Sequence, residues 1–181
     1  GVALSSIATA AISFLMLLDT HRTLTVLTWL LGGFNLSSWG KLGWALVYVL
    51  PAVVVILVHR RTLNVLQVDE EEARQLGLNV ERVKLVLLGS ASLATAAAVS
   101  VSGLIGFVGL IVPHAVRLLW GPDHRHLLPM SMILGATFLV LADLLARTVA
   151  VPREIPVGII TALAGAPFFL YLLRQRTRKI F

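Results

Sequence analysis

The sequence predicts an all-α fold, a polytopic transmembrane helical bundle. Its mean hydropathy is +0.90, and 57% of its 181 residues are hydrophobic while 13% are charged, against about 25% charged residues in ordinary soluble domains. The apolar residues form continuous runs instead of the alternating segments of a transmembrane barrel, so the membrane spans are expected to be helices. The absence of cysteine excludes a disulfide framework and a thiolate metal site.

Six apolar segments are long enough to cross a bilayer, which takes roughly 17–25 helical residues. A seventh, at residues 24–31, is too short and is expected to be an interfacial or re-entrant helix. No linker or internal repeat divides the chain, so residues 1–181 are expected to form a single transmembrane domain. The six spans are expected at about residues 2–18, 42–58, 85–101, 104–120, 127–148 and 157–173.

The longest polar segment, residues 59–84, separates the second span from the third and contains a short capped helix. Asp69 can cap its N-terminus, with Glu72 completing a capping box, and Gly77 supplies a left-handed stop. Asn79 can cap the helix that follows. A polar two-turn helix between membrane spans is a candidate docking element for a soluble partner, and a solvated loop is the alternative.

The distribution of Lys and Arg predicts the orientation, because cytoplasmic loops carry an excess of these residues. Eleven of the 15 lie on the side of segment 59–84, the turn at Gly121 and the C-terminus. That side is therefore expected to be cytoplasmic, with both ends of the chain on it. Topology also explains the pI near 10.8 without nucleic-acid binding. The four basic residues on the outer side are Arg22, Lys41, Arg147 and Arg153.

Two patterns inside the spans have a packing interpretation beside a functional one. Asp143 and Arg147 are four residues apart on one helix face, which suits an intrahelical ion pair at the outer interface or a docking site. Gly103, Gly106 and Gly109 recur every third residue of the fourth span, and close helix packing is the favoured interpretation.

The histidines do not predict a metal site. His114 follows Pro113 within the fourth span, where a structural role is favoured over a contact with haem or a proton path. His124 and His126 lie two residues apart on a polar turn, but no third ligand is evident. We expect no bound metal and no cofactor in this chain.

Several motifs in a fixed order resemble the FecCD-type permeases of ABC importers, which take up iron-siderophores, haem and cobalamin. The resemblance covers essentially the whole chain. The motifs are WLLGGF at 29–34, EARQLGL at 72–78, GLIGFVGLIVPH at 103–114, DHRHLLP at 123–129, ADLLAR at 142–147, EIPVG at 154–158 and GAPF at 165–168.

The resemblance implies a type II importer permease fold with about ten spans, of which this chain would be the C-terminal half and a fragment. It implies a homodimer in the bacterial inner membrane, with a translocation path lined by the first span and residues 24–31. It further implies that Arg147, and more weakly Arg153, dock a periplasmic or lipid-anchored substrate-binding protein. The segment implied to couple to the ATPase subunit comprises Glu71, Glu72, Ala73, Arg74, Leu76, Gly77 and Leu78.

Two other function classes remain open from the residues alone. The chain has no recognisable phosphate-binding loop. Gly40 and Lys41 could belong to a Walker motif only with Gly at position 35 and Ser or Thr at position 42, where Asn and Leu stand. ATP hydrolysis is therefore expected in a partner. An intramembrane enzyme lacks a recognisable motif. An ion-coupled secondary transporter would place carboxylates near the bilayer midplane, but Asp143 lies near the outer end of its span. The chain is therefore expected to be a transport subunit and not an enzyme.

Overall fold

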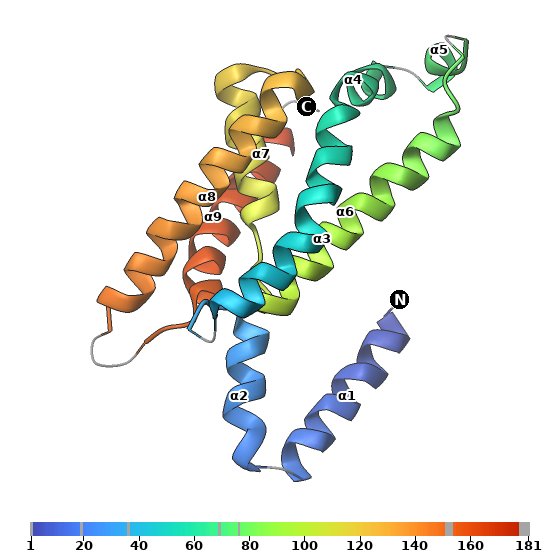
Figure 1. Ribbon diagram of the computed structural model, residues 1–181. Helices are drawn as coiled ribbons and strands as arrows, with labels where there is room; N and C mark the ends of the chain where they lie inside the picture. The colour runs from blue at the N-terminus through green and yellow to red at the C-terminus, as the bar shows by residue number, and fades with distance from the viewer. Residues whose placement is uncertain are drawn as a thin grey trace.

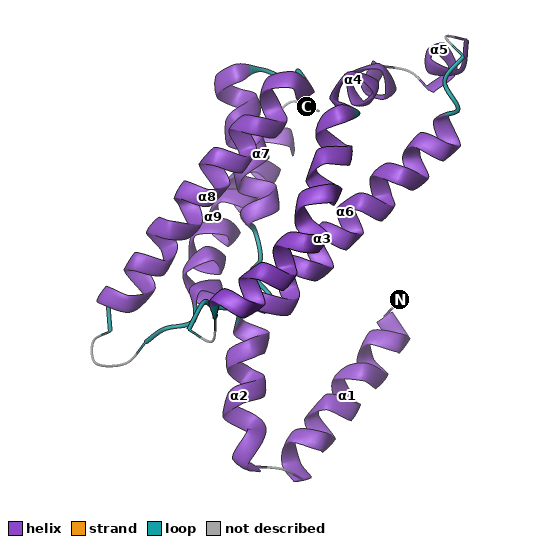
Figure 2. Ribbon diagram, in the orientation of Figure 1, coloured by secondary structure: helices purple, strands orange, loops and turns teal. Residues whose placement is uncertain are grey.

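The computed structural model describes residues 2–18, 20–35, 37–68, 70–75, 77–150 and 154–177. Within these ranges the chain forms nine helices and no strand (Figure 2), which confirms the all-α class. The helices are α1 (Val2–Leu18), α2 (Thr20–Leu31), α3 (Trp39–Val58), α4 (Arg60–Val68), α5 (Glu70–Gln75), α6 (Val80–Ser102), α7 (Val108–Trp120), α8 (His124–Thr148) and α9 (Val157–Thr177).

Three of these helices, α3, α6 and α8, are long and apolar enough to cross a membrane. The other three predicted spans correspond to shorter apolar helices, α1, α7 and α9. The fourth span begins later than predicted, because Gly103 and Phe107 both have left-handed backbone angles, with φ of 67° and 66°. Residues 103–107 therefore connect α6 to α7 and are not part of a helix.

The polar segment between α3 and α6 holds two helices where the sequence predicted one. Helix α5 ends as predicted: Gly77 has φ 79° and donates its backbone N–H to Arg74. Asn79 caps α6 as predicted, accepting from the backbone N–H of Arg82 at 3.1 Å. Asp69, the candidate N-cap of α5, lies outside the described residues. Helix α4 was not predicted, and its apolar residues are too few to mark it as a span.

The helices form two groups (Figure 1). Helices α3 and α6 pack along each other, while α7, α8 and α9 pack together. The second group is centred on the buried side chains Val112, Val116 and Leu127. A smaller cluster of Ala142, Ala146 and Val157 joins α8 to α9. Most other large apolar side chains are exposed, as expected of helices that face lipid.

The two ends of the bundle carry different features (Figure 1). Helices α4 and α5, the turn between α7 and α8, and the C-terminal end of α9 lie at one end. The α6–α7 connection, the end of α8 and the beginning of α9 lie at the other, from which α1 and α2 extend as a hairpin. Within the described residues, the predicted grouping of basic segments at one end of the bundle therefore holds for α4, α5, the α7–α8 turn and the end of α9.

Candidate functional site

Helix α5 is anchored by one small side chain. Ala73 is fully buried, and α5 packs against α4 and α6. Glu71 and Arg74 are exposed, whereas Leu78 is half-buried and donates its backbone N–H to Ala73 at 3.1 Å. Burial of Ala73 and partial burial of Leu78 thus leave a charged face of α5 exposed. Of the other residues predicted here, Gly77 is exposed, the side chain of Glu72 is not described and Leu76 lies outside the described residues.

Helix α4 is bonded to the beginning of α8 through Asn64. The Asn64 side-chain amide donates to Asp123 Oδ1 at 2.6 Å, and its oxygen accepts from the His124 backbone N–H at 2.8 Å. His124 Nδ1 lies 2.7 Å from the same oxygen and can donate to it in the Nδ1–H tautomer. No sequence motif marked Asn64 as a functional residue. The features that could have indicated this contact are an amide within a short amphipathic segment and a polar Asp-His turn elsewhere in the chain.

Asp123 has two structural roles in this contact. Its Oδ1 also accepts from the Arg125 backbone N–H at 2.8 Å, which caps α8. The Arg125 backbone N–H, and next the Asn64 amide, stabilise the ionised carboxylate and hold the pKa of Asp123 below its ordinary value. The same carboxylate therefore starts α8 and holds α4.

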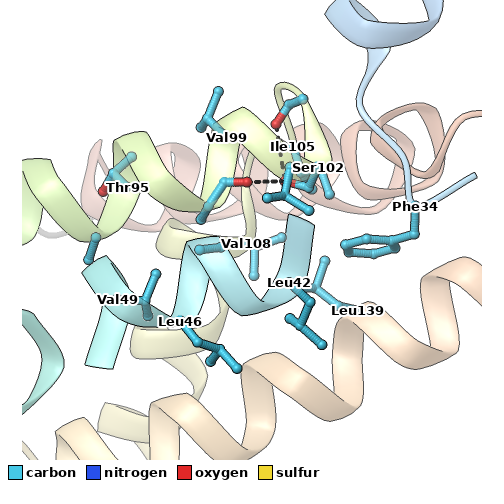
Figure 3. Close-up of a pocket in the computed structure, with 15 residues that line it drawn as sticks. Phe34, Leu42, Leu46, Val49, Thr95, Val99, Ser102, Ile105, Val108 and Leu139 are labelled. Atoms are coloured by element: carbon cyan, nitrogen blue, oxygen red, sulfur yellow. Dashed lines mark hydrogen bonds between the residues drawn. The ribbon is translucent and has the colours of Figure 1, made fainter. Parts of the chain in front are cut away.

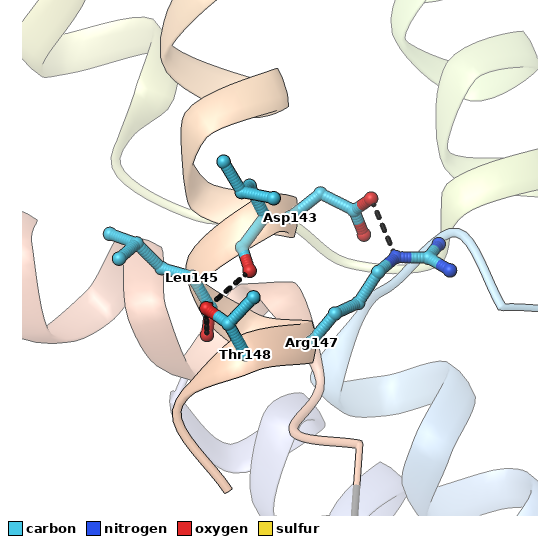
Figure 4. A network of polar contacts seen from close by, with 5 residues as sticks. Asp143, Leu145, Arg147 and Thr148 are labelled. Carbon is cyan, nitrogen blue, oxygen red and sulfur yellow. Dashed lines mark hydrogen bonds and ion pairs between the residues drawn. The ribbon is translucent and has the colours of Figure 1, made fainter. Parts of the chain in front are cut away.

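The opposite end of α8 carries the predicted ion pair (Figure 4). Arg147 Nε donates to Asp143 Oδ2 at 2.8 Å, and the Arg147 side chain is 45% exposed against 23% for Asp143. In Figure 4 the remaining guanidinium nitrogens point away from the carboxylate, so they can take a further acceptor. Arg153, the second predicted docking residue, lies outside the described residues.

Three motif segments far apart in the sequence meet where α2, α6 and α9 converge. Gly33 donates its backbone N–H to Ser102 at 2.7 Å, and Gly158 donates to Gly32 at 3.2 Å. The Leu104 backbone N–H donates to Trp29 at 3.3 Å. These backbones approach closely enough that a β-carbon at Gly32 would overlap the carbonyl of Leu104. This contact explains why glycines stand in three separate motifs.

The three glycines predicted to pack the fourth span do not lie on one helix. Gly103 ends α6 with a positive φ and packs against the carbonyl of Trp29, Gly106 lies in the connection, and Gly109 lies in the first turn of α7. A β-carbon at Gly106 or Gly109 would meet nothing within 4 Å. The three residues do not share a helix because α7 begins only at Val108. Of these three glycines, Gly103 is the one that packs closely against another part of the described chain.

His114 has a packing partner. Its ring lies edge-on to Phe168 on α9, with ring centroids 5.8 Å apart. Nearby on α9, Gly165 leaves space for the Phe107 ring, which a β-carbon would overlap. The motif at 165–168 therefore holds α9 against α7 and its preceding connection.

An apolar groove of about 580 Å³ lies between the two helix groups (Figure 3). Its two hydroxyl side chains, Thr95 and Ser102, donate to carbonyls of their own helix at 2.8 and 3.0 Å. Neither hydroxyl is paired with a base, so the groove does not supply the nucleophile–base arrangement of an intramembrane hydrolase. The apolar lining includes Phe34, Leu42, Leu46, Val49, Val99, Ile105, Val108 and Leu139.

A family model and several known proteins match nearly the whole chain. The model of the FecCD transport family matches residues 1–175. The chain is 52% identical over 176 residues to the cobalamin import system permease protein BtuC of Halobacterium salinarum, covering 97% of this chain and 47% of that protein. It is 42% identical over 181 residues to the hemin transport system permease protein HmuU of Yersinia pestis, covering 99% and 54%.

A further relative is the uncharacterized ABC transporter permease protein YvrB of Bacillus subtilis, which is 48% identical over 97% of this chain and 50% of its own. A solved inward-facing structure of a transporter assigned to the metal-chelate ABC type is 41% identical to this chain. It superposes with a TM-score of 0.82, covering 96% of this chain and 57% of that one. The chain spans about half the length of the curated relatives it matches.

Proposed function

Because this chain belongs to the FecCD transport family, we propose that it is part of the permease subunit of a binding-protein-dependent ABC importer. The cargo is an iron chelate, siderophore or haem, or cobalamin. The observation that carries this proposal is the superposition of nearly the whole chain on the solved transporter that is assigned to the metal-chelate ABC type. The substrate class is supported by the relatives that are named for cobalamin and hemin transport.

The α5 end couples to a separate ATPase subunit, which hydrolyses ATP. Burial of Ala73 supports this role, because it fixes α5 on α4 and α6 while Glu71 and Arg74 remain exposed. Glu72, Leu76, Gly77 and Leu78 complete the segment on the strength of the family motif. A nucleotide-driven displacement of the ATPase would push on this short helix as a rigid element.

The opposite end docks the substrate-binding protein. Arg147 supports this role because its side chain is 45% exposed and lies at the opposite end of α8 from α4. Its hydrogen bond to Asp143 uses the Nε atom, which leaves the other guanidinium nitrogens for a partner. Arg153 follows it closely in the sequence. An exposed cation of this kind steers encounter with an acidic partner and sets the register of docking.

The topology proposed for this part of the permease is six spans and a short interfacial helix, with both ends in the cytoplasm of a bacterial cell. Helix α1 is apolar on most of its surface, but Ser5, Ser6, Thr9 and Ser13 line one shallow groove on it. That polar face suits the wall of a translocation path between two copies of the permease, which α1 and α2 would line. The chain itself binds no cofactor.

Reconstitution of the full-length permease tests the proposed function. Proteoliposomes containing the permease, its ATPase and the binding protein are supplied with cyanocobalamin, haemin or ferric citrate, and uptake is measured with ATP or a non-hydrolysable analogue. We expect uptake of one of the probes with ATP and no uptake with the non-hydrolysable analogue. Uptake without the ATPase, driven by an ion gradient, would instead support a secondary transporter.

A further inference from the structure

The two helix groups are bonded to each other at the α5 end through Asn64. Helices α3, α4 and α6 form one group with α5, and α4 is the helix of that group that packs on α8. Each side-chain hydrogen bond described between α4 and the turn before α8 involves Asn64, with partners Asp123 and His124. Farther from this end, the groups are separated by the apolar groove.

The contact needs a side chain that donates and accepts at once. Asn64 donates to an ionised carboxylate, which makes a stronger bond than a neutral acceptor. Its oxygen accepts from the first backbone N–H of α8, one of the helix-terminal groups that lack an intrahelical partner. An aspartate at position 64 would keep the acceptor but set two carboxylates against each other. A leucine would lose every bond.

We propose that Asn64 is a positioning residue that makes α4 and the first turn of α8 move as one body. A displacement of α5 reaches α6 directly along the chain, since only residues 76–79 separate the two helices. It reaches the α7–α8–α9 group through Asn64, because α8 begins at the residue that Asn64 bonds. This inference rests on the proposed function, in which the ATPase pushes on α5.

The geometry favours transmission here over transmission through the membrane-embedded part. Coupling between distant sites is carried by packed or hydrogen-bonded elements that move together. The groove wall is mostly apolar, and its two hydroxyls, Thr95 and Ser102, donate to carbonyls of their own helix. The far end is fixed by the backbone bonds of Gly32, Gly33 and Ser102. Loss of the Asn64 bonds would let α3 and α6 move while α8 stays behind.

The test uses the full-length permease with its ATPase and binding protein in proteoliposomes. Asn64→Leu is compared with Gln67→Leu, which removes an exposed amide from the same helix. The readouts are uptake of the probe that the wild type transports, ATP hydrolysis, and association of the ATPase in a pull-down. We expect Asn64→Leu to lower probe imported per ATP about tenfold, with ATPase association and hydrolysis retained and Gln67→Leu unchanged.

A reciprocal exchange keeps the inference testable if Asn64→Leu does not assemble. Asn64→Asp alone should lose coupling, and Asn64→Asp with Asp123→Asn should restore it, because the exchanged pair keeps a donor and an acceptor in place. Coupling equal to wild type in Asn64→Leu, or no restoration in the exchanged pair, would overturn the role of Asn64. Failure of the wild type itself to transport any probe would instead contradict the proposed function.

Discussion

Gly158, the second residue of α9, lies against the carbonyl oxygen of Leu31, the last residue of α2, so closely that a β-carbon would overlap that oxygen. Its backbone N–H also donates to Gly32 at 3.2 Å. Two motif segments more than a hundred residues apart in the sequence are therefore held in direct backbone contact. Helix α9 can begin at this place only if the residue has no side chain.

Alanine at position 158 should destabilise the protein by roughly 1–3 kcal/mol, since it overpacks a rigid backbone contact. Gly109→Ala is the matched control: Gly109 is also the second residue of its helix, and a β-carbon there meets nothing within 4 Å. Thermal unfolding of the purified full-length protein in detergent measures both. Equal melting temperatures for the two variants would contradict the close contact at Gly158.

The contact between Asp123 and Asn64 should weaken in acid. The pKa of Asp123 is lowered from its ordinary value of 3.8, chiefly by the Arg125 backbone N–H. A carboxylate with a lowered pKa adds stability that is present above the unfolded value and lost as pH falls through the folded one. Thermal unfolding of wild type and Asp123→Asn between pH 3 and 7 should show a wild-type advantage that shrinks below about pH 3.8. A constant difference across this range would refute the assignment.

Simultaneous replacement of Glu72 and Arg74 by alanine should uncouple hydrolysis from transport. Arg74 lies on the exposed charged face of α5, while Ala73 still anchors the helix. We expect the probe imported per ATP to fall about tenfold, with docking of the binding protein unchanged. Glu81→Ala, which removes an exposed carboxylate from the first turn of α6, is the control. Wild-type coupling in the double variant would count against α5 as the ATPase contact.

Charge reversal at Arg147 should weaken association with the binding protein. Arg147→Glu removes the exposed cation and sets a second carboxylate beside Asp143. The dissociation constant at low salt is expected to rise about tenfold, and the difference should shrink as salt screens the interaction. Lys41→Glu makes the same charge change in the first turn of α3, near the same end. Surface plasmon resonance measures both, and full-strength binding by Arg147→Glu would reject the docking role.

The sequence alone determined the features that depend on local chemistry. Continuous apolar runs identified α3, α6 and α8 as helices long enough to cross a membrane. The stop at Gly77 and the cap at Asn79 followed from residues within a few positions of each helix end. The ordered motifs indicated the family, whose model matches residues 1–175.

Tertiary structure decided what depends on contacts between distant residues. The apolar run after Gly103 has the composition of a span, but its first part is a connection, because its backbone bonds to Trp29 and lies beside Gly32. Hydropathy reports only that such a segment avoids water, so it does not distinguish an apolar connection from a helix. Asn64 and Asp123 are 59 residues apart, and only folding brings a donor and an acceptor of that kind within 2.6 Å.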